Sequence, residues 1–316
     1  MSECKPVGPK GRKGSNQQLM ARSPESMWSL AWKQFRRHPM AIWGSIILLL
    51  IILSALLAPF WPLDPEVINV RNRWQPPSWQ HPMGTDRSGR DMLARILWGG
   101  RISLSVGVLA VLTSLVIGIM VGGTAGYWGG MVDSVLMRFT DFFLCFPSLF
   151  VLILLSFLLL RLDIPFLRGG VAQIVLVIGV MTWMPVARLV RGVVLSVKNE
   201  EFVLAARACG VNDRRIFFRH ILPNAVGPVI VNATMGVAWA ILTESGLSFL
   251  GYGVQPPVPS WGNILTDAQQ QMSLYPWLAL FPGFMIFITV ICINFLGDAL
   301  RDALDPHKCV GLRPGR

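Results

Sequence analysis

Six long apolar runs alternate with polar segments along this chain of 316 residues. Each run is close to the roughly 20 residues that a helix needs to cross about 30 Å of hydrocarbon, and none contains Asp, Glu, Lys, Arg or His. Continuously apolar runs lack the alternation of barrel strands, so the pattern predicts an all-α membrane protein with six transmembrane helices. The predicted spans are Met40–Phe60, Ile102–Gly126, Phe142–Leu160, Val171–Ala187, Ala225–Thr243 and Trp277–Leu296.

The composition supports a membrane protein. Hydrophobic residues make up 53% of the chain and charged residues 14%, with a mean hydropathy of +0.53, whereas roughly a quarter of the residues in soluble domains are charged. This excludes a disordered or collagen-like chain and most soluble enzymes. The first apolar run is too long for a signal peptide and has no clean cleavage site, so we predict a retained anchor.

The net charge of +11 is typical of a nucleic-acid-binding protein or of a membrane protein with a basic cytoplasmic side. Twenty of the 28 Lys and Arg residues fall in the leader, the second and fourth loops and the tail, and eight fall in the other loops. Because positive charge concentrates in cytoplasmic loops, both termini are predicted to be cytoplasmic in a plasma (inner) membrane. We therefore assign the charge to topology and to contact with membrane lipids, with no nucleic acid as partner.

These spans divide the chain into segments. The cytoplasmic basic leader is 1–39, with about the first 20 residues expected to be disordered because they are rich in Gly and Lys. The first span is 40–60 and an external loop is 61–101. The core is 102–297, with a cytoplasmic loop at 188–224 and an external loop at 244–276, and a cytoplasmic tail is 298–316.

The loop 188–224 carries helical signals. Residues 200–208 read as a short helix that ends at Gly210, and Asn212 and Asp213 offer N-caps for a second run at Arg214–Ile221. The first helix is built largely from small residues, which let a partner approach closely. A docking surface and an ordinary amphipathic interfacial helix both fit this pattern.

Three glycines in the second span, Gly118, Gly122 and Gly126, repeat at intervals of four residues. Such small residues let another helix approach closely in lipid. Packing within the chain and a subunit interface are both compatible with them.

No catalytic, cofactor or metal motif is found. The sequence lacks a G-x-x-x-x-G-K-S/T phosphate loop, its four histidines all lie outside the six runs, and its five cysteines are scattered. We predict no catalytic residue, no bound metal and no cofactor held by this chain. Because the six runs are uncharged, an ion relay inside the membrane is not indicated, and energy must arrive from outside, through the loop 188–224.

Two external loops hold the remaining charged and aromatic candidates. Asp86, Arg90 and Asp91 are expected to form a local ion-pair set that positions the second helix. Glu244 and Asp267 are the acids of the loop 244–276. Trp261 is expected at the membrane interface or against a docked protein, unless the loop simply caps the bundle.

The loop 188–224 resembles the cytoplasmic EAA loop of ABC-importer permeases. The resemblance rests on L-A-A-R-A-C-G at Leu204–Gly210 and H-I-L-P at His220–Pro223. Leu204 stands where that family often has Glu. The positions that match are Ala205, Ala206, Gly210, Leu222 and Pro223.

Three further segments are similar to the C-type permease of the dipeptide, oligopeptide and nickel group. They are H-P-M-G-T-D-R-S-G-R-D at His81–Asp91, L-S-F-L-G-Y-G-V-Q-P-P-V-P-S-W-G at Leu247–Gly262, and G-D-A-L-R-D-A-L-D-P at Gly297–Pro306. With the EAA-like loop, the resemblance covers about residues 27–306.

The resemblance implies the fold of a type I importer permease with six transmembrane helices. It implies a second homologous permease, two ATP-binding subunits that use ATP and Mg²⁺, and an external solute-binding protein. Residues 204–210 would couple the chain to an ATPase, and small peptides would be the substrate. Nickel or another small solute is the alternative within this class, and an ATP-independent channel or scaffold is the alternative outside it.

Overall fold

The computed structural model describes residues 35–36, 38–60, 62, 64–162, 164–167 and 169–304. The predicted disorder of the first 20 residues lies outside this part of the chain, as do Cys4, Cys309 and the tail beyond Leu304. Within it the structure is helical, with a single isolated β-bridge between Thr85 and Asp91.

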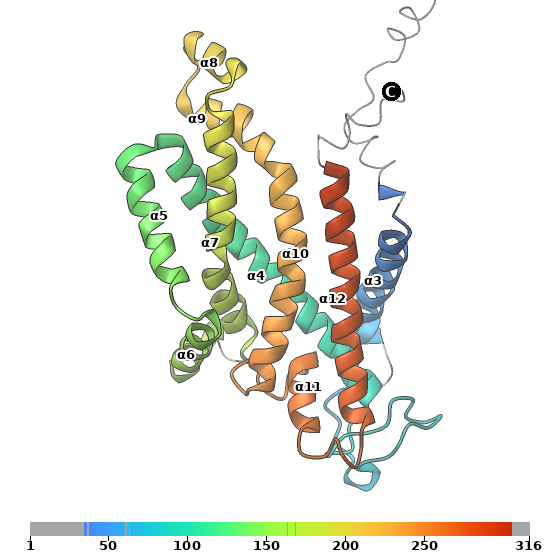
Figure 1. The fold of residues 1–316 in the computed structure, drawn as a ribbon. Helices are drawn as coiled ribbons and strands as arrows, with labels where there is room; N and C mark the ends of the chain where they lie inside the picture. Colours follow the sequence, from blue (N-terminus) through green and yellow to red (C-terminus); the bar gives the residue numbers. More distant parts are fainter. Residues whose placement is uncertain are drawn as a thin grey trace, which may run out of the picture.

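The helices follow the chain as a bundle of long elements joined by short ones (Figure 1). They are α3 (Pro39–Leu57), η1 (Ala58–Phe60), η2 (Val70–Asn72), α4 (Met92–Trp128), α5 (Gly130–Leu144), α6 (Ser148–Arg161), η3 (Pro165–Leu167), α7 (Val171–Val197), α8 (Glu201–Ala208), α9 (Asp213–Ile216), the π-helical η4 (Phe217–Ile221), α10 (Leu222–Phe249), α11 (Trp261–Ala268) and α12 (Trp277–Leu304).

Five helical stretches among the described residues are long and apolar enough to span a membrane, and the bent pair α5–α6 makes a sixth if it is counted as one span. The predicted all-α membrane architecture is confirmed in this sense. Helices α8 and α9 lie at one end of the bundle, which we call the α8 end. Helix α11 and the segment before α4 lie at the opposite end, the α11 end (Figure 1). The start of α3 and the end of α12 meet at the α8 end, where His38 Nε2 lies 3.6 Å from Asp302 Oδ2.

The third predicted span is not one straight helix. Helices α5 and α6 meet at 87°, and Pro147 stands at the break as the N-cap residue of α6. Proline disfavours a helical conformation in the residue before it, so the apolar run 142–160 bends where a uniform run was expected. Apolarity alone therefore misplaced this span.

Four other helices extend beyond their apolar runs. Helix α4 begins at Met92, ten residues before the predicted start, because Asp91 caps it by accepting a hydrogen bond from the Ala94 backbone amide at 2.9 Å. Helix α7 continues to Val197, which removes the first ten residues from the predicted loop 188–224, and α12 continues through the start of the predicted tail. Two of the charged residues in these extensions pair with neighbouring helices, Arg95 with Asp267 of α11 and Arg191 with Asp133 of α5.

The fifth span also extends in both directions. Helices α9, η4 and α10 form a continuous helical stretch from Asp213 to Phe249, so Arg214–Ile221 is the beginning of a membrane helix and is not a separate helix that ends before Pro223. At its other end this stretch contains Glu244, which was expected in an external loop.

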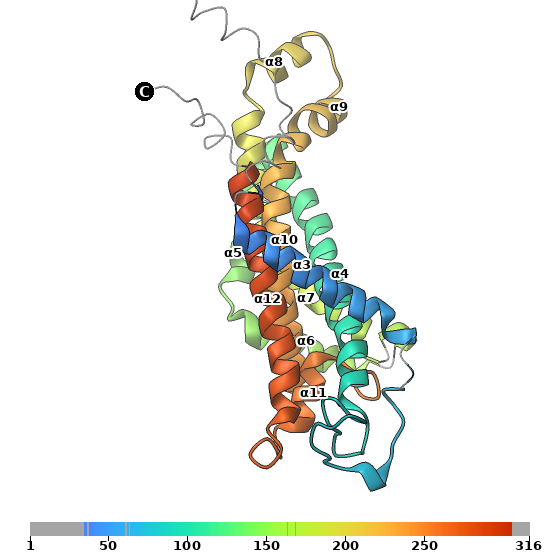
Figure 2. The ribbon, with the colours of Figure 1, turned by 90° about the vertical axis from the view of Figure 1, so that its right-hand side faces the viewer.

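The core of the bundle is centred on α4 and α7, the most extensive helix pair. Helix α4 crosses the bundle obliquely from the α11 end to the α8 end (Figure 1), and α3 lies obliquely across the outside of α12 and α4 (Figure 2). A cluster of buried apolar side chains from α4, α6, α7 and α10 fills the middle: Val106, Ala110, Val111, Leu152, Ile174, Val177, Ile178, Ala240 and Leu247.

Candidate functional site

The predicted turn at Gly210 is present between α8 and α9. The Gly210 backbone amide donates to the Arg207 carbonyl at 3.0 Å, and the Val211 amide donates to the Ala206 carbonyl at 3.1 Å. This is the Schellman pattern, which needs a left-handed residue after the helix, and Gly210 has a φ of +75°. Asn212 then caps α9 by accepting from the Arg214 amide at 3.1 Å.

Helix α8 is held to the bundle on one face. Val203 is fully buried among Val190 and Val194 of α7 and Ile216 and Ile221 of the following helix. Burying an apolar side chain of this size stabilises a contact by about 1.5–3 kcal/mol relative to exposure. The α8–α9 segment is therefore a fixed projection of the bundle.

The remaining surface of α8 is exposed and mostly apolar, and it includes the acidic Glu201. Phe202 is 47% and Leu204 48% exposed. The small residues predicted to allow close approach follow them: Ala205, Ala208 and Cys209 are exposed, and Ala206 is half-buried. An apolar helix face that projects from the end of the bundle is the kind of surface that another protein covers.

Contacts from α4 and α7 fix the base of this projection. The Tyr127 hydroxyl donates to the Asp213 carboxylate, and the Tyr127 ring meets the Phe217 ring edge-on. Lys198 Nζ donates to the Gly126 carbonyl at 3.0 Å, which joins the ends of α7 and α4. The end of α4 therefore contacts α9 directly, and the end of α7 is bonded to the end of α4.

Leu222 and Pro223 lie in the first turn of α10, just past the π-helical stretch. Leu222 is half-buried and packs on the cluster around Val203, whereas Pro223 is exposed. The Asn224 side-chain amide donates to the His220 carbonyl at 2.6 Å next to the proline, which has no amide of its own. These residues shape the path from α9 into α10 and do not join the exposed face of α8.

The glycine stripe of α4 packs against α7 within the chain. A Cβ on Gly122 would lie 2.1 Å from the Ala187 carbonyl oxygen, and one on Gly118 would lie 2.6 Å from Val186. A Cβ on Gly126 would meet Val194 at 2.8 Å. The geometry of these glycines therefore fits packing within the chain and not a subunit interface.

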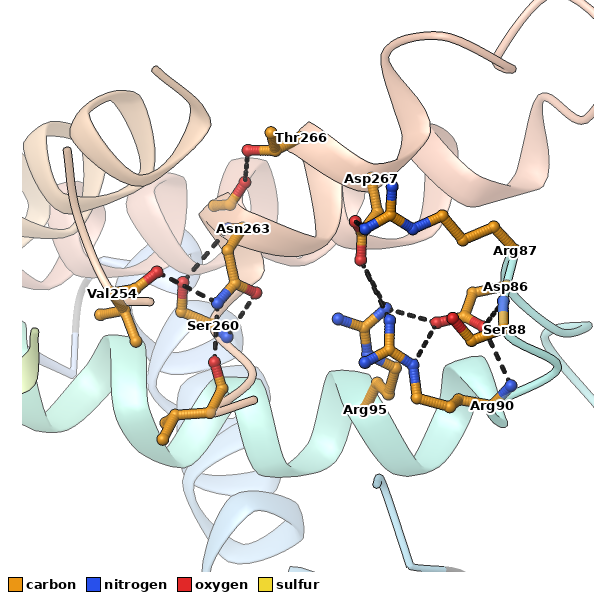
Figure 3. A network of polar contacts seen from close by, with 12 residues as sticks. Asp86, Arg87, Ser88, Arg90, Arg95, Val254, Ser260, Asn263, Thr266 and Asp267 are labelled. Atoms are coloured by element: carbon orange, nitrogen blue, oxygen red, sulfur yellow. Dashed lines mark hydrogen bonds and ion pairs between the residues drawn. The ribbon is translucent and has the colours of Figure 1, made fainter. Parts of the chain in front are cut away.

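A buried ion network lies at the α11 end (Figure 3). Asp86 accepts from Arg90 Nε at 2.6 Å and from Arg95 Nη1 at 2.7 Å, and Arg95 also lies 3.1 Å from Asp267. The network thus joins the loop before α4, α4 itself and α11. Asp91 is not part of it, because its carboxylate caps α4 and lies 2.8 Å from His81 Nδ1.

The predicted local ion-pair set was therefore incomplete. Arg95 was read as part of a loop and Asp267 belongs to a segment 172 residues away in the sequence. The cue that was missed is the helix cap at Asp91, which places Arg95 one turn into α4. The partner Asp267 could be found only from the fold.

The model of the family described as binding-protein-dependent transport system inner membrane component matches residues 92–308, which include the α8–α9 projection. This chain belongs to that family of permeases. Residues 26–77 also match the N-terminal transmembrane domain of oligopeptide transport permease C. The resemblance read from the motifs is thereby confirmed.

Curated relatives cover nearly the whole permease. It is 43% identical over 284 residues to the oligopeptide transport system permease protein OppC of Haemophilus influenzae, a match that covers 89% of each chain. It is 43% identical to the dipeptide transport system permease protein DppC of Alkalihalophilus pseudofirmus over 89% of this chain and 90% of that one. The glutathione transport system permease protein GsiD of Pectobacterium atrosepticum is 38% identical over 90% of this chain and 93% of its own.

Among solved structures, an inward-facing form of the MetNI methionine ABC transporter aligns with a TM-score of 0.53 at 20% identity, covering 68% of this permease and 98% of that chain. A second crystal form of the same transporter gives a TM-score of 0.51 at 19% identity. These likenesses establish the fold of an importer permease.

Trp261 and Glu244 were expected in an external loop, but both lie inside the helical bundle. Trp261 is fully buried, and its indole nitrogen donates to the Ile96 carbonyl at 3.0 Å, so it lies neither at the membrane interface nor against another protein. Glu244 is also fully buried, within the α10 span, so the membrane helices are not free of charged residues. Helix α10 continues past its apolar run because the hydroxyl groups of Ser103 and Ser248 donate hydrogen bonds to the Glu244 carboxylate.

Proposed function

We propose that this permease is one of two homologous membrane subunits of an ABC importer for di- and oligopeptides. Two ATP-binding subunits would bind ATP and Mg²⁺ and hydrolyse the ATP, an external solute-binding protein would deliver the substrate, and this chain would take no catalytic part. Family membership supports the transporter class, since the matching family is defined by binding-protein-dependent transport.

The exposed apolar face of α8 is the observation that carries the proposed ATPase contact. Phe202 and Leu204 flank the small residues Ala205 and Ala208 on the exposed side of the helix, which also carries Glu201, while Val203 fixes the helix from the buried side. Gly210 sets the angle at which α9 leaves it. Leu204 is apolar where related permeases often carry Glu, so this position would contribute apolar packing instead of an ion pair.

Peptides are proposed as the substrate because the relatives at 42–43% identity are named for oligopeptide or dipeptide transport. The glutathione permease relative, at 38% identity, is also named for a peptide-like solute. Transport would proceed by alternating access, a population shift between inward- and outward-open states that ATP binding biases.

The proposed orientation places the α8 end in the cytoplasm. The loop that forms α8 and α9 is basic, with Arg207, Arg214, Arg215 and Arg219, and positive charge concentrates in cytoplasmic loops. Both termini would then be cytoplasmic, because the two described ends of the chain also meet at the α8 end.

Co-purification tests this proposal. The tagged chain, solubilised gently from its native membrane, should recover a second six-helix permease and ATP-binding subunits. In proteoliposomes, a peptide-loaded binding protein should stimulate ATP hydrolysis by this complex. Recovery of the chain alone in several mild detergents, or peptide flux that does not need ATP, would favour a channel instead.

A further inference from the structure

Glu244 is fully buried in α10, and no ion pair of the described residues includes it. Its carboxylate instead accepts hydrogen bonds from Ser103 Oγ of α4 at 2.8 Å and from Ser248 Oγ at 2.7 Å. Ser245 Oγ lies 3.5 Å away. Burying a carboxylate without a cation is costly, so the residue calls for a role that an apolar side chain could not fill.

The same two serines bind the segment 250–268, which we call the cap. The Trp261 backbone amide donates to Ser103 Oγ at 3.2 Å, and the Val254 amide donates to Ser248 Oγ at 3.0 Å. A hydroxyl group has one proton, and here it points to Glu244 while the oxygen accepts from the cap. The carboxylate therefore orients both hydroxyls toward the backbone of the cap.

The cap also fits tightly on α10. A Cβ on Gly262 would lie 2.6 Å from the Ser245 carbonyl oxygen, and one on Gly253 would lie 2.0 Å from Ser248 Oγ. Thr266 Oγ1 lies 3.1 Å from both the Ser248 and the Phe249 carbonyl oxygens, which share its one proton. Figure 3 shows how Ser260 and Asn263 close the start of α11 beside these contacts.

Helix α10 connects the site where the cap packs to the opposite end of the bundle. The continuous helical stretch runs from Asp213, beside α8, to Phe249, where the cap begins. We propose that Glu244 is the positioning residue that makes the cap move as one body with α10. A displacement of the α8–α9 projection would then reach the α11 end. This inference rests on the proposed function, since it assigns Glu244 a part in coupling ATP hydrolysis to events at that end.

The test uses the complete transporter in proteoliposomes with its peptide-loaded binding protein. The readout is the ratio of stimulated to unstimulated ATP hydrolysis, followed against binding-protein concentration. Glu244→Ala leaves both serine hydroxyls without their acceptor, so the ratio should fall about tenfold. The binding-protein concentration for half-maximal stimulation should not change, because no contact surface of the cap is altered. Glu244→Gln keeps an acceptor oxygen for one of the two serines and should restore part of the ratio.

A second pair of variants covers the case in which Glu244→Ala does not assemble. Ser103→Ala removes only the hydroxyl between Glu244 and the Trp261 amide, and it should lower the ratio in the same direction. Ser105→Ala is the matched control on α4, because its hydroxyl is exposed and bonds only its own helix at the Arg101 carbonyl.

The outcomes separate the two proposals. An unstimulated wild-type complex would contradict the proposed function. If the wild-type complex is stimulated and Glu244→Ala has the same ratio, the proposed role of Glu244 is overturned and the proposed function stands. Where Glu244→Ala does not assemble, an unchanged ratio in Ser103→Ala has the same meaning. A loss in Glu244→Gln as large as in Glu244→Ala, or a shift in half-maximal concentration without a fall in the ratio, would also overturn it.

Discussion

The two ends of the permease differ in what they expose. At the α8 end, a mostly apolar helix surface is exposed and the buried side chain of Val203 anchors the helix. At the α11 end, charged side chains are buried and the backbone of the cap packs closely on α10. Phe202 and Leu204 are about half exposed at the first end, while Asp86 and Arg95 are 1% and 3% exposed at the second. An exposed apolar face can bind a partner and release it. A buried ion network holds its elements in a fixed arrangement, because moving them apart would leave buried charges unpaired.

The largest effect is expected from Arg95→Ala, which removes the most deeply buried cation of the network and leaves Asp86 and Asp267 with only the more exposed Arg90 and Arg87. It should lower the free energy of unfolding by about 3–5 kcal/mol, measured by thermal or denaturant unfolding in detergent. Arg87 contacts the same Asp267 at 3.2 Å, but its side chain is 58% exposed. Arg87→Ala should therefore cost less than about 1 kcal/mol, and equal losses in the two variants would remove the contrast between buried and exposed pairs.

The next effect concerns the helix pair that joins the two ends. Gly122→Ala should lower the free energy of unfolding by about 1–3 kcal/mol, because its Cβ would lie 2.1 Å from the Ala187 carbonyl and force α4 from α7. Gly192→Ala on α7 is the control, since nothing lies within 4 Å of its Cβ position. If both variants unfold at the same temperature, the close approach of α4 and α7 is not a source of stability.

Val203→Ala and Leu204→Ala compare the two faces of α8. Loss of the buried methyl groups of Val203 should destabilise the projection by about 1–2 kcal/mol, seen as faster hydrogen exchange of the α8 amides. Leu204→Ala should leave this exchange unchanged and instead weaken the recovery of ATP-binding subunits. Normal recovery with Leu204→Ala would argue that this face is not covered by a partner.

A change in stability as small as that of Val203→Ala is expected at Gly210. Gly210→Val forces a β-branched residue into a left-handed conformation, at a cost of about 1–2 kcal/mol, and should leave the protein inserted while transport is uncoupled from ATP hydrolysis. Gly210→Asn is the matched control, because Asn tolerates this conformation. Normal transport by Gly210→Val would mean that the angle between α8 and α9 does not matter for coupling.

Much of the candidate site could be predicted from local sequence. The helix 200–208, the left-handed turn at Gly210 and the cap at Asn212 depend on residues next to one another, and each was located. The partners of α8 were not located. Val203 is buried by Val190 and Val194, which lie in the part of α7 beyond the predicted end of the apolar run. The ion network was found only in part for the same reason, since Arg95 and Asp267 are distant in sequence.

The sequence by itself determined the membrane class, the approximate spans, the short loop helices and the family, because apolar length, helix caps and motif spacing are local properties of the chain. Only the tertiary structure decided which polar groups lie inside the bundle. Burial of Glu244, Arg95 and Trp261 depends on a hydroxyl, a carboxylate and a carbonyl that other helices supply through Ser103, Asp267 and Ile96. These partners satisfy the buried polar groups, and they lie 141 to 172 residues away in the sequence, where no local pattern could identify them.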